Sequence, residues 1–98
     1  MILVTERETE EGLLVAACDS DVLGKTFEDG ELSLSVTEEF YGGDEMDVDA
    51  AMAAIRRADV ANLVGTKTVE AAIDAGVVDE STVLAVEDTL HAQLLRMR

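Results

Sequence analysis

The alternation of apolar and polar positions is most organised between residues 59 and 76, where a glycine separates two apolar segments. The first segment has apolar side chains at i, i+3 and i+4, which predicts a short helical turn; they are Val60, Leu63 and Val64. Gly65 suits the left-handed residue that ends such a turn. The second segment predicts an amphipathic helix over residues 66–75, with Thr66 as its N-cap and Gly76 just past its end. The apolar stripe of this helix consists of Val69, Ala72 and Ile73.

Short apolar runs elsewhere predict strands, because a buried strand needs only four to eight such residues. The predicted strands are residues 1–5, 13–18, 32–37 and 83–86. The first two are joined by a polar segment that suits a hairpin. The third alternates Leu and Val with Ser and Thr, which indicates one buried face and one solvated face.

A second amphipathic helix is predicted after Gly42-Gly43. Asp47 is its expected N-cap, and Arg56 and Arg57 fall in its last turn, where cations interact favourably with the helix dipole. Its apolar stripe consists of Val48, Ala51, Met52 and Ile55.

The tail over residues 88–98 fits two patterns. The spacing of Val86, Leu90, Leu94 and Met97 fits a helix, whereas Leu90, Ala92 and Leu94 fit one face of a strand. Periodicity alone slightly favours the helix.

Taken together, the patterns predict a single α+β domain over residues 1–98, with about five short strands and two main helices packed on the sheet.

Charge changes this picture more than any motif. The chain has 22 acidic against 7 basic residues and a net charge of −15. Such a surface repels itself unless salt screens it, so we expect a salt-loving source, although an acidic protein of an ordinary cytosol remains the alternative. The charge also disfavours nucleic acid, whose binding sites are normally basic. A single cysteine, Cys18, excludes an internal disulfide, and the absence of a long apolar run predicts a cytoplasmic protein with no membrane span.

Two groups of residues are candidates for a binding site. Gly65, Thr66 and Lys67 place backbone N–H groups, a hydroxyl and an ammonium at a predicted helix start, which suits an anion, although the pattern favours ordinary capping. The second group contains the polar or aromatic side chains Tyr41, Asn62, His91 and Gln93. Each has a structural role as its alternative. No pair of close metal-ligating residues occurs, so we expect no metal and no cofactor.

Several segments together resemble a small archaeal family catalogued as domain of unknown function 424. They are Ala17-Cys-Asp19, Leu23-Gly-Lys-Thr-Phe27, Glu38-Glu-Phe-Tyr41, Ala61-Asn-Leu-Val-Gly65, the helix up to Gly76, and His91-Ala-Gln93. The resemblance covers nearly the whole chain. It implies an archaeal cytosolic protein, and it favours a strand for the tail, since the family usually carries Gly and Pro where this chain has Asp88-Thr-Leu90. The association of the family with translation-factor genes implies the ribosome, RNA or a translation factor as a partner.

Three functions follow as hypotheses. The first is a non-catalytic binding or accessory protein associated with translation or RNA. The second is a small-molecule, anion-binding or enzymatic site near Thr66 and His91. The third is a homo-oligomeric structural subunit that associates through a sheet edge or a helix face.

Overall fold

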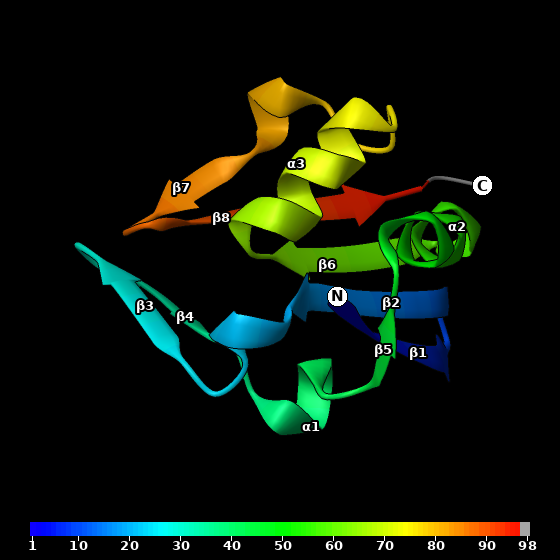
Figure 1. Cartoon of the computed structure of the whole chain (residues 1–98), viewed down its shortest axis with the longest axis horizontal. Coiled ribbons are helices and arrows are strands. Elements are labelled where there is room, and N and C mark those ends of the chain that lie inside the picture. Colours follow the sequence, from blue (N-terminus) through cyan, green and yellow to red (C-terminus); the bar gives the residue numbers. More distant parts are fainter. Residues whose placement is uncertain (97–98) are drawn as a thin grey trace.

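A computed structural model describes residues 1–96 (Figure 1). Its main sheet has six strands in the order β5–β1–β2–β6–β8–β7. Their bounds are β1 (Ile2–Thr9), β2 (Gly12–Asp19), β5 (Asp44–Met46), β6 (Val60–Val64), β7 (Leu84–Val86) and β8 (Thr89–Leu95). A separate hairpin pairs β3 (Thr26–Asp29) with β4 (Leu32–Ser35). The helices are α1 (Glu38–Tyr41), α2 (Val48–Arg57) and α3 (Thr66–Asp74), with 3₁₀ turns η1 (Ser20–Val22) and η2 (Glu80–Thr82).

The predicted architecture of about five strands and two main helices is wrong. Within residues 1–96 eight strands form two sheets, and the fold is richer in strand than in helix. The largest single correction concerns Val60–Val64, which is the strand β6 in the middle of the main sheet and not a helical turn. Its i, i+3, i+4 spacing arises because a strand that is covered on one face and partly buried on the other carries apolar residues at most positions.

One parallel pair organises the sheet. Strands β2 and β6 run parallel, with Leu14 opposite Val60 and Cys18 opposite Val64, whereas every other pairing is antiparallel. A parallel pair needs a crossover connection, and the chain makes it through the β3–β4 hairpin and the helices α1 and α2. The end of β2 therefore lies beside the loop that follows β6.

Helices α2 and α3 pack on one face of the sheet, as Figure 1 shows. The core there is aliphatic and includes Val4, Val15, Ile55, Leu63 and Val69. Both predicted helices are confirmed in place, but Val48 of the stripe predicted for α2 is 40% exposed and lies outside the core. Asp47 caps α2 by accepting a hydrogen bond from the N–H of Ala50 at 2.9 Å.

The C-terminal end of α3 has the predicted glycine geometry. Gly76 has a φ of +73°, and its N–H donates to the carbonyl of Ile73 at 3.0 Å. The N–H of Val77 donates to the carbonyl of Ala72 at 2.9 Å. This pair of bonds is a Schellman motif, which satisfies carbonyls at the helix end.

The opposite face of the sheet is only half covered. The β3–β4 hairpin, η1 and α1 pack over it and form a second core cluster. That cluster consists of Leu3, Ala16, Cys18, Val22, Phe27, Val36, Tyr41, Val64 and Val86. These residues occupy the end of the sheet at which β2 and β6 finish, so the other end of the same face carries no such layer among residues 1–96.

The tail is the strand β8, as the family resemblance implied and periodicity alone did not. Leu90, Ala92 and Leu94 face the helices, and the residues between them face the half-covered side. Met97, part of the helical alternative, lies outside the described residues.

Candidate functional site

The start of α3 is capped by a side chain from the end of strand β2. The N-cap is Gly65 and has no side chain to offer, so the predicted capping by Thr66 is wrong. The carboxylate of Asp19, at the end of β2, accepts hydrogen bonds from the N–H of Lys67 at 3.1 Å and from the N–H of Thr68 at 2.8 Å. It also accepts the hydroxyl of Thr68 at 2.7 Å. The N–H groups that an external anion would need therefore already bind a negative charge of the chain itself.

Gly65 is required at this junction for two reasons. Its φ of +116° is a conformation that other residues rarely adopt. A Cβ atom at this position would also lie 2.4 Å from Cγ of Asp19, well inside van der Waals contact. The absence of a side chain thus lets the Asp19 carboxylate reach the helix.

A second aspartate–glycine pair stands at the opposite end of the same two strands. Oδ2 of Asp59, just before β6, accepts a hydrogen bond from the N–H of Leu13 at 2.8 Å. The N–H of Asp59 donates in turn to the carbonyl of Leu13 at 2.9 Å. A Cβ on Gly12 would lie 2.1 Å from Oδ2 of Asp59. The parallel pair β2–β6 is thus held at both ends by an aspartate seated against a glycine of the other strand, which fixes its register.

Three predicted site residues come together on the half-covered face. Asn62 of β6 lies directly opposite Gln93 of β8, and His91 lies opposite Val64. Paired Cα atoms lie at most about 5.5 Å apart, and each further residue adds about 3.8 Å. The Cα atoms of His91 and Thr66 are therefore within about 13 Å of each other. Burial lowers the pKa of His91 below its usual 6.5, so its imidazole is neutral at neutral pH.

The uncovered end of this face forms a continuous surface, which we call the open face. The strand register places its residues in two rows, Thr5–Ala16–Asn62–Gln93 and Arg7–Leu14–Val60–Leu95. Leu95 is 67% exposed, although a packed layer would bury it. A hollow of about 260 Å³ lies between Leu14, Val60, Thr9 and Glu11. The open face is therefore apolar and amide-rich rather than charged.

Tyr41 does not reach this surface. Its side chain is 4% exposed and belongs to the second core cluster, where burial raises its pKa to about 12. Its neighbour Phe40 contacts it edge to face with the ring centroids 4.9 Å apart, and the guanidinium of Arg7 lies 5.4 Å from the centre of the Phe40 ring. Phe40 thus borders the open face next to Arg7.

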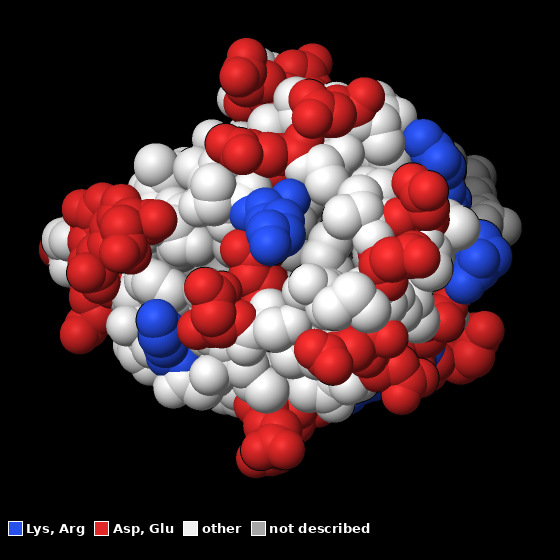
Figure 2. All heavy atoms as spheres, viewed as in Figure 1, with Lys and Arg blue, Asp and Glu red and all other residues white. Residues whose placement is uncertain are grey.

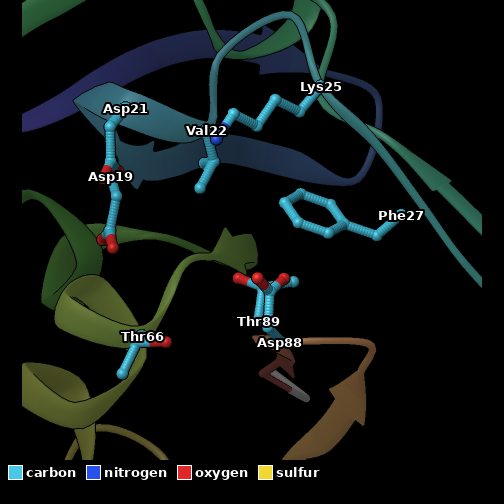
Figure 3. Close-up of a pocket in the computed structure, with 8 residues that line it drawn as sticks. All are labelled: Asp19, Asp21, Val22, Lys25, Phe27, Thr66, Asp88 and Thr89. Atoms are coloured by element: carbon cyan, nitrogen blue, oxygen red, sulfur yellow. The ribbon is translucent and has the colours of Figure 1, made fainter.

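Thr66 and Lys67 lie at the other end of the sheet, around Asp19. A cavity of about 230 Å³ opens there, which we call the acidic cavity; Figure 3 shows the residues that line it, among them Asp19, Asp21, Lys25, Phe27, Asp88 and Thr89. Lys67 lines a neighbouring hollow with Asp19 and Asp21. The predicted residues therefore fall into two places, with Asn62, His91 and Gln93 on the half-covered face and Thr66 and Lys67 around Asp19.

The sequence matches, over residues 6–97, the model of a family described as a protein of unknown function, DUF424. The chain belongs to the DUF424 family. A crystal structure of an uncharacterized conserved protein from Methanopyrus kandleri has the same fold, with a TM-score of 0.80 and 24% sequence identity over 99% of this chain and 94% of that chain. No curated protein matches the chain. The family predicted from the sequence is thus confirmed, with an archaeal homologue.

Metal binding, a membrane-crossing helix and thiol chemistry have no support in the described part of this DUF424 chain. Among residues 1–96, no three or more His, Cys, Asp or Glu side chains are placed to hold a metal ion. None of the helices within those residues has the length and apolar character needed to cross a bilayer. Cys18 is fully buried, and burial raises its pKa to about 11, so the thiol is not a nucleophile at neutral pH.

Sequence reasoning missed the residues that matter most around Asp19. Asp19, Asp88 and Thr89 were not among the candidate site residues. In a chain with 22 acidic residues no single aspartate stands out by its type. The one usable signal was the glycine at position 65 beside a helix start without an aspartate or serine cap of its own.

Proposed function

We propose that this DUF424 protein is a non-catalytic binding protein that docks a protein partner on its open face. One observation carries the proposal: Ala16 is buried, and of the seven other open-face residues six are uncharged, in a chain of which 30% is charged. Depletion of charge with exposed apolar and amide side chains is the composition of an interface centre. The remaining residue, Arg7, is of a type enriched at interfaces.

Backbone groups add a second means of attachment. Strand β7 pairs only with Thr89–His91 of β8, so the outer edge of β8 extends beyond it. The carbonyl of Leu90 and the N–H of Arg96 point toward β6. Because the backbone groups of successive residues in an antiparallel strand point to opposite sides, the N–H and C=O groups of Gln93 and Leu95 point away from β6, toward the free edge. A partner strand can pair with these groups, as in recognition by strand addition.

The partner class that we propose is a translation factor or a ribosomal protein, which is the association that the family resemblance implies. Acidic side chains spread over the helix-covered face and only isolated basic groups lie among them, as Figure 2 shows. The open face on the other side of the sheet carries Arg7 as its one basic residue rather than the basic patch of a nucleic-acid site, which supports a protein partner over RNA. The partner identity rests on the resemblance, whereas the docking surface rests on the geometry.

Affinity capture with a matched pair of variants tests the proposal. Leu95→Glu places a charge on the open face, and Val48→Glu places one on α2 at a side chain that is 40% exposed on the other side of the sheet. From an extract of a halophilic archaeon in molar KCl, we expect wild type and Val48→Glu to retain the same ribosomal or factor protein. Leu95→Glu should retain at least about tenfold less, since a charge desolvated at an interface costs several kcal/mol.

Other results of the same capture contradict the proposal. Equal retention by Leu95→Glu removes the open face from the interface. Recovery of RNA alone favours the RNA alternative, and recovery of neither class excludes both. Self-association through the β8 edge is the second candidate, and sedimentation of the purified protein over a range of concentrations shows it as a dimer that Leu95→Glu abolishes.

We also propose that the protein works in the concentrated salt of a halophile's cytoplasm. The chain has a net charge of −15, and residues 1–96 contain a single ion pair, between Arg57 and Glu6 at 3.4 Å. Attraction between opposite charges therefore offsets little of the repulsion between the acidic side chains. At ~1 M salt the Debye length falls to about 3 Å and that repulsion is screened. Raising KCl from low to molar concentration should raise the melting temperature by about 10 °C or more, the equivalent of roughly 2 kcal/mol. Circular dichroism melting measures it, and a flat melting temperature across the series would contradict a halophilic origin.

A further inference from the structure

The acidic cavity lies away from the open face. Four segments of the chain meet around it. It is bounded by the end of β2 with η1, the start of β3, the start of α3 and the turn between β7 and β8. Figure 3 shows the side chains of Asp88 and Thr89 directed into the space between Asp19 and Phe27. The turn that carries Asp88 is held in place, because the neighbouring Glu87 accepts a hydrogen bond from the N–H of Glu28 in β3. The walls of the cavity are therefore set by the fold.

Thr89 is the residue that points to a ligand. Its side chain is only 3% exposed, and its hydroxyl has no hydrogen-bond partner among residues 1–96. A buried hydroxyl without a partner destabilises the folded state, so native proteins nearly always satisfy it. Thr89 is one of the residues that line the acidic cavity, so a molecule bound there lies beside this buried side chain.

The charged groups around the cavity are also unmatched. The carboxylates of Asp21 and Asp88 and the ammonium of Lys25 have no ion-pair partner among the described residues, since the one ion pair there joins Arg57 to Glu6. The Asp19 carboxylate, by contrast, is occupied by the N-terminus of α3. Two free carboxylates and one free ammonium thus face the same small space. A ligand with both signs of charge complements them.

We propose that the acidic cavity binds a small zwitterionic amine of the amino-acid class. The ligand's ammonium donates to the carboxylates of Asp21 and Asp88 and to the hydroxyl of Thr89, and its carboxylate accepts from the ammonium of Lys25. Val22 and Phe27, which are 8% and 7% exposed, supply the apolar wall for its methylene groups. The volume of about 230 Å³ lies below the usual range for drug-sized ligands and limits the guest to a few heavy atoms.

Three small probes with a three-carbon chain separate the parts of this proposal. β-Alanine carries both charges, propylamine lacks the carboxylate, and propionate lacks the ammonium. In titrations followed by ¹H–¹⁵N NMR in molar KCl, β-alanine should shift the amide signals of Asp21, Asp88 and Thr89. Propylamine and propionate should bind at least about tenfold more weakly, because each leaves charged cavity groups unpaired. The assignment is overturned if β-alanine leaves these signals in place or if propylamine binds equally well.

Thr89→Val distinguishes a ligand-binding hydroxyl from a structural one. The substitution preserves the shape of the side chain and removes a hydroxyl that makes no hydrogen bond in the protein, so the melting temperature should stay the same or rise. The affinity for β-alanine should fall about tenfold. Thr82→Val is the matched control, since the Thr82 hydroxyl donates to the carbonyl of Asp79 at 2.8 Å outside the cavity. It should lower the melting temperature and leave the affinity unchanged. Unchanged affinity in Thr89→Val would remove the hydroxyl from the site.

Discussion

Replacing Gly65 by alanine is expected to destabilise this DUF424 protein by about 3–5 kcal/mol, which is a large part of the stability of a domain this small. Strain at a φ of +116° accounts for about 1–3 kcal/mol. The new Cβ would lie 2.4 Å from Cγ of Asp19 and would push the carboxylate away from α3. The N–H groups of Lys67 and Thr68 would then lose their acceptor, at a further cost of about 1–3 kcal/mol.

Gly76→Ala is the control for the backbone term alone. Gly76 also has a positive φ, +73°, but a Cβ there would meet no atom within 4 Å. Its substitution should therefore cost only roughly 1–2 kcal/mol, the price of a left-handed alanine. Chemical denaturation of both variants at the same molar KCl concentration measures the difference. Equal losses in the two variants would show that the contact with Asp19 contributes nothing.

Local pattern was sufficient for the two long helices because their signals are contained in their own residues. The stripe and Asp47 cap of α2, and the stripe and Gly76 end of α3, depend on neighbours within one or two turns. These elements lie where the sequence placed them. The same local reasoning failed at Thr66, because the group that caps α3 comes from a residue 48 positions away from Lys67 in the chain.

The strands were harder because a strand depends on what it pairs with. Strand β1 continues through polar residues to Thr9 because each of them pairs with a residue of β2. The backbone pairing, and not an apolar side-chain pattern, makes this segment a strand. Acidic side chains make up two of the three residues in Asp44–Met46 and two of the four in Thr26–Asp29, yet these segments are an edge strand and a hairpin strand whose backbones are held by β1 and β4. Strand preference in such segments reflects pairing context more than residue type.

The two candidate sites divide in the same way. Asn62, His91 and Gln93 alternate along strands, so once β6 and β8 pair, their side chains share one face. The strand alternative for the tail predicted that His91 and Gln93 share a face, whereas Asn62 was predicted in a helical turn and its place opposite Gln93 was not predicted. The acidic cavity had no such signal, since it joins Asp21, Lys25, Asp88 and Thr89 from segments more than 60 residues apart.

Asp19→Ala is expected to cost about 2–4 kcal/mol, because it removes all three hydrogen bonds at the start of α3, including one to the buried hydroxyl of Thr68. Asp47→Ala is the matched control at the other helix. It removes one capping bond, from the N–H of Ala50, and should cost about 1 kcal/mol. Denaturation midpoints of the two variants, each with unchanged denaturant dependence, give the comparison.

The double variant Asp19→Ala/Gly65→Ala shows whether the aspartate and the glycine act as one device. Without the carboxylate, a Cβ at position 65 meets only the Cβ of residue 19, at 2.8 Å, so Gly65→Ala in that background should cost less than in the wild type, mainly its backbone strain of about 1–3 kcal/mol. The summed losses of the single variants should then exceed the loss of the double variant by about 1–3 kcal/mol. Additive losses would mean that Gly65 is required for its conformation alone and that Asp19 holds α3 independently of it. A non-additive result would show that the missing side chain at Gly65 and the carboxylate of Asp19 act through one contact, which joins β2, β6 and α3.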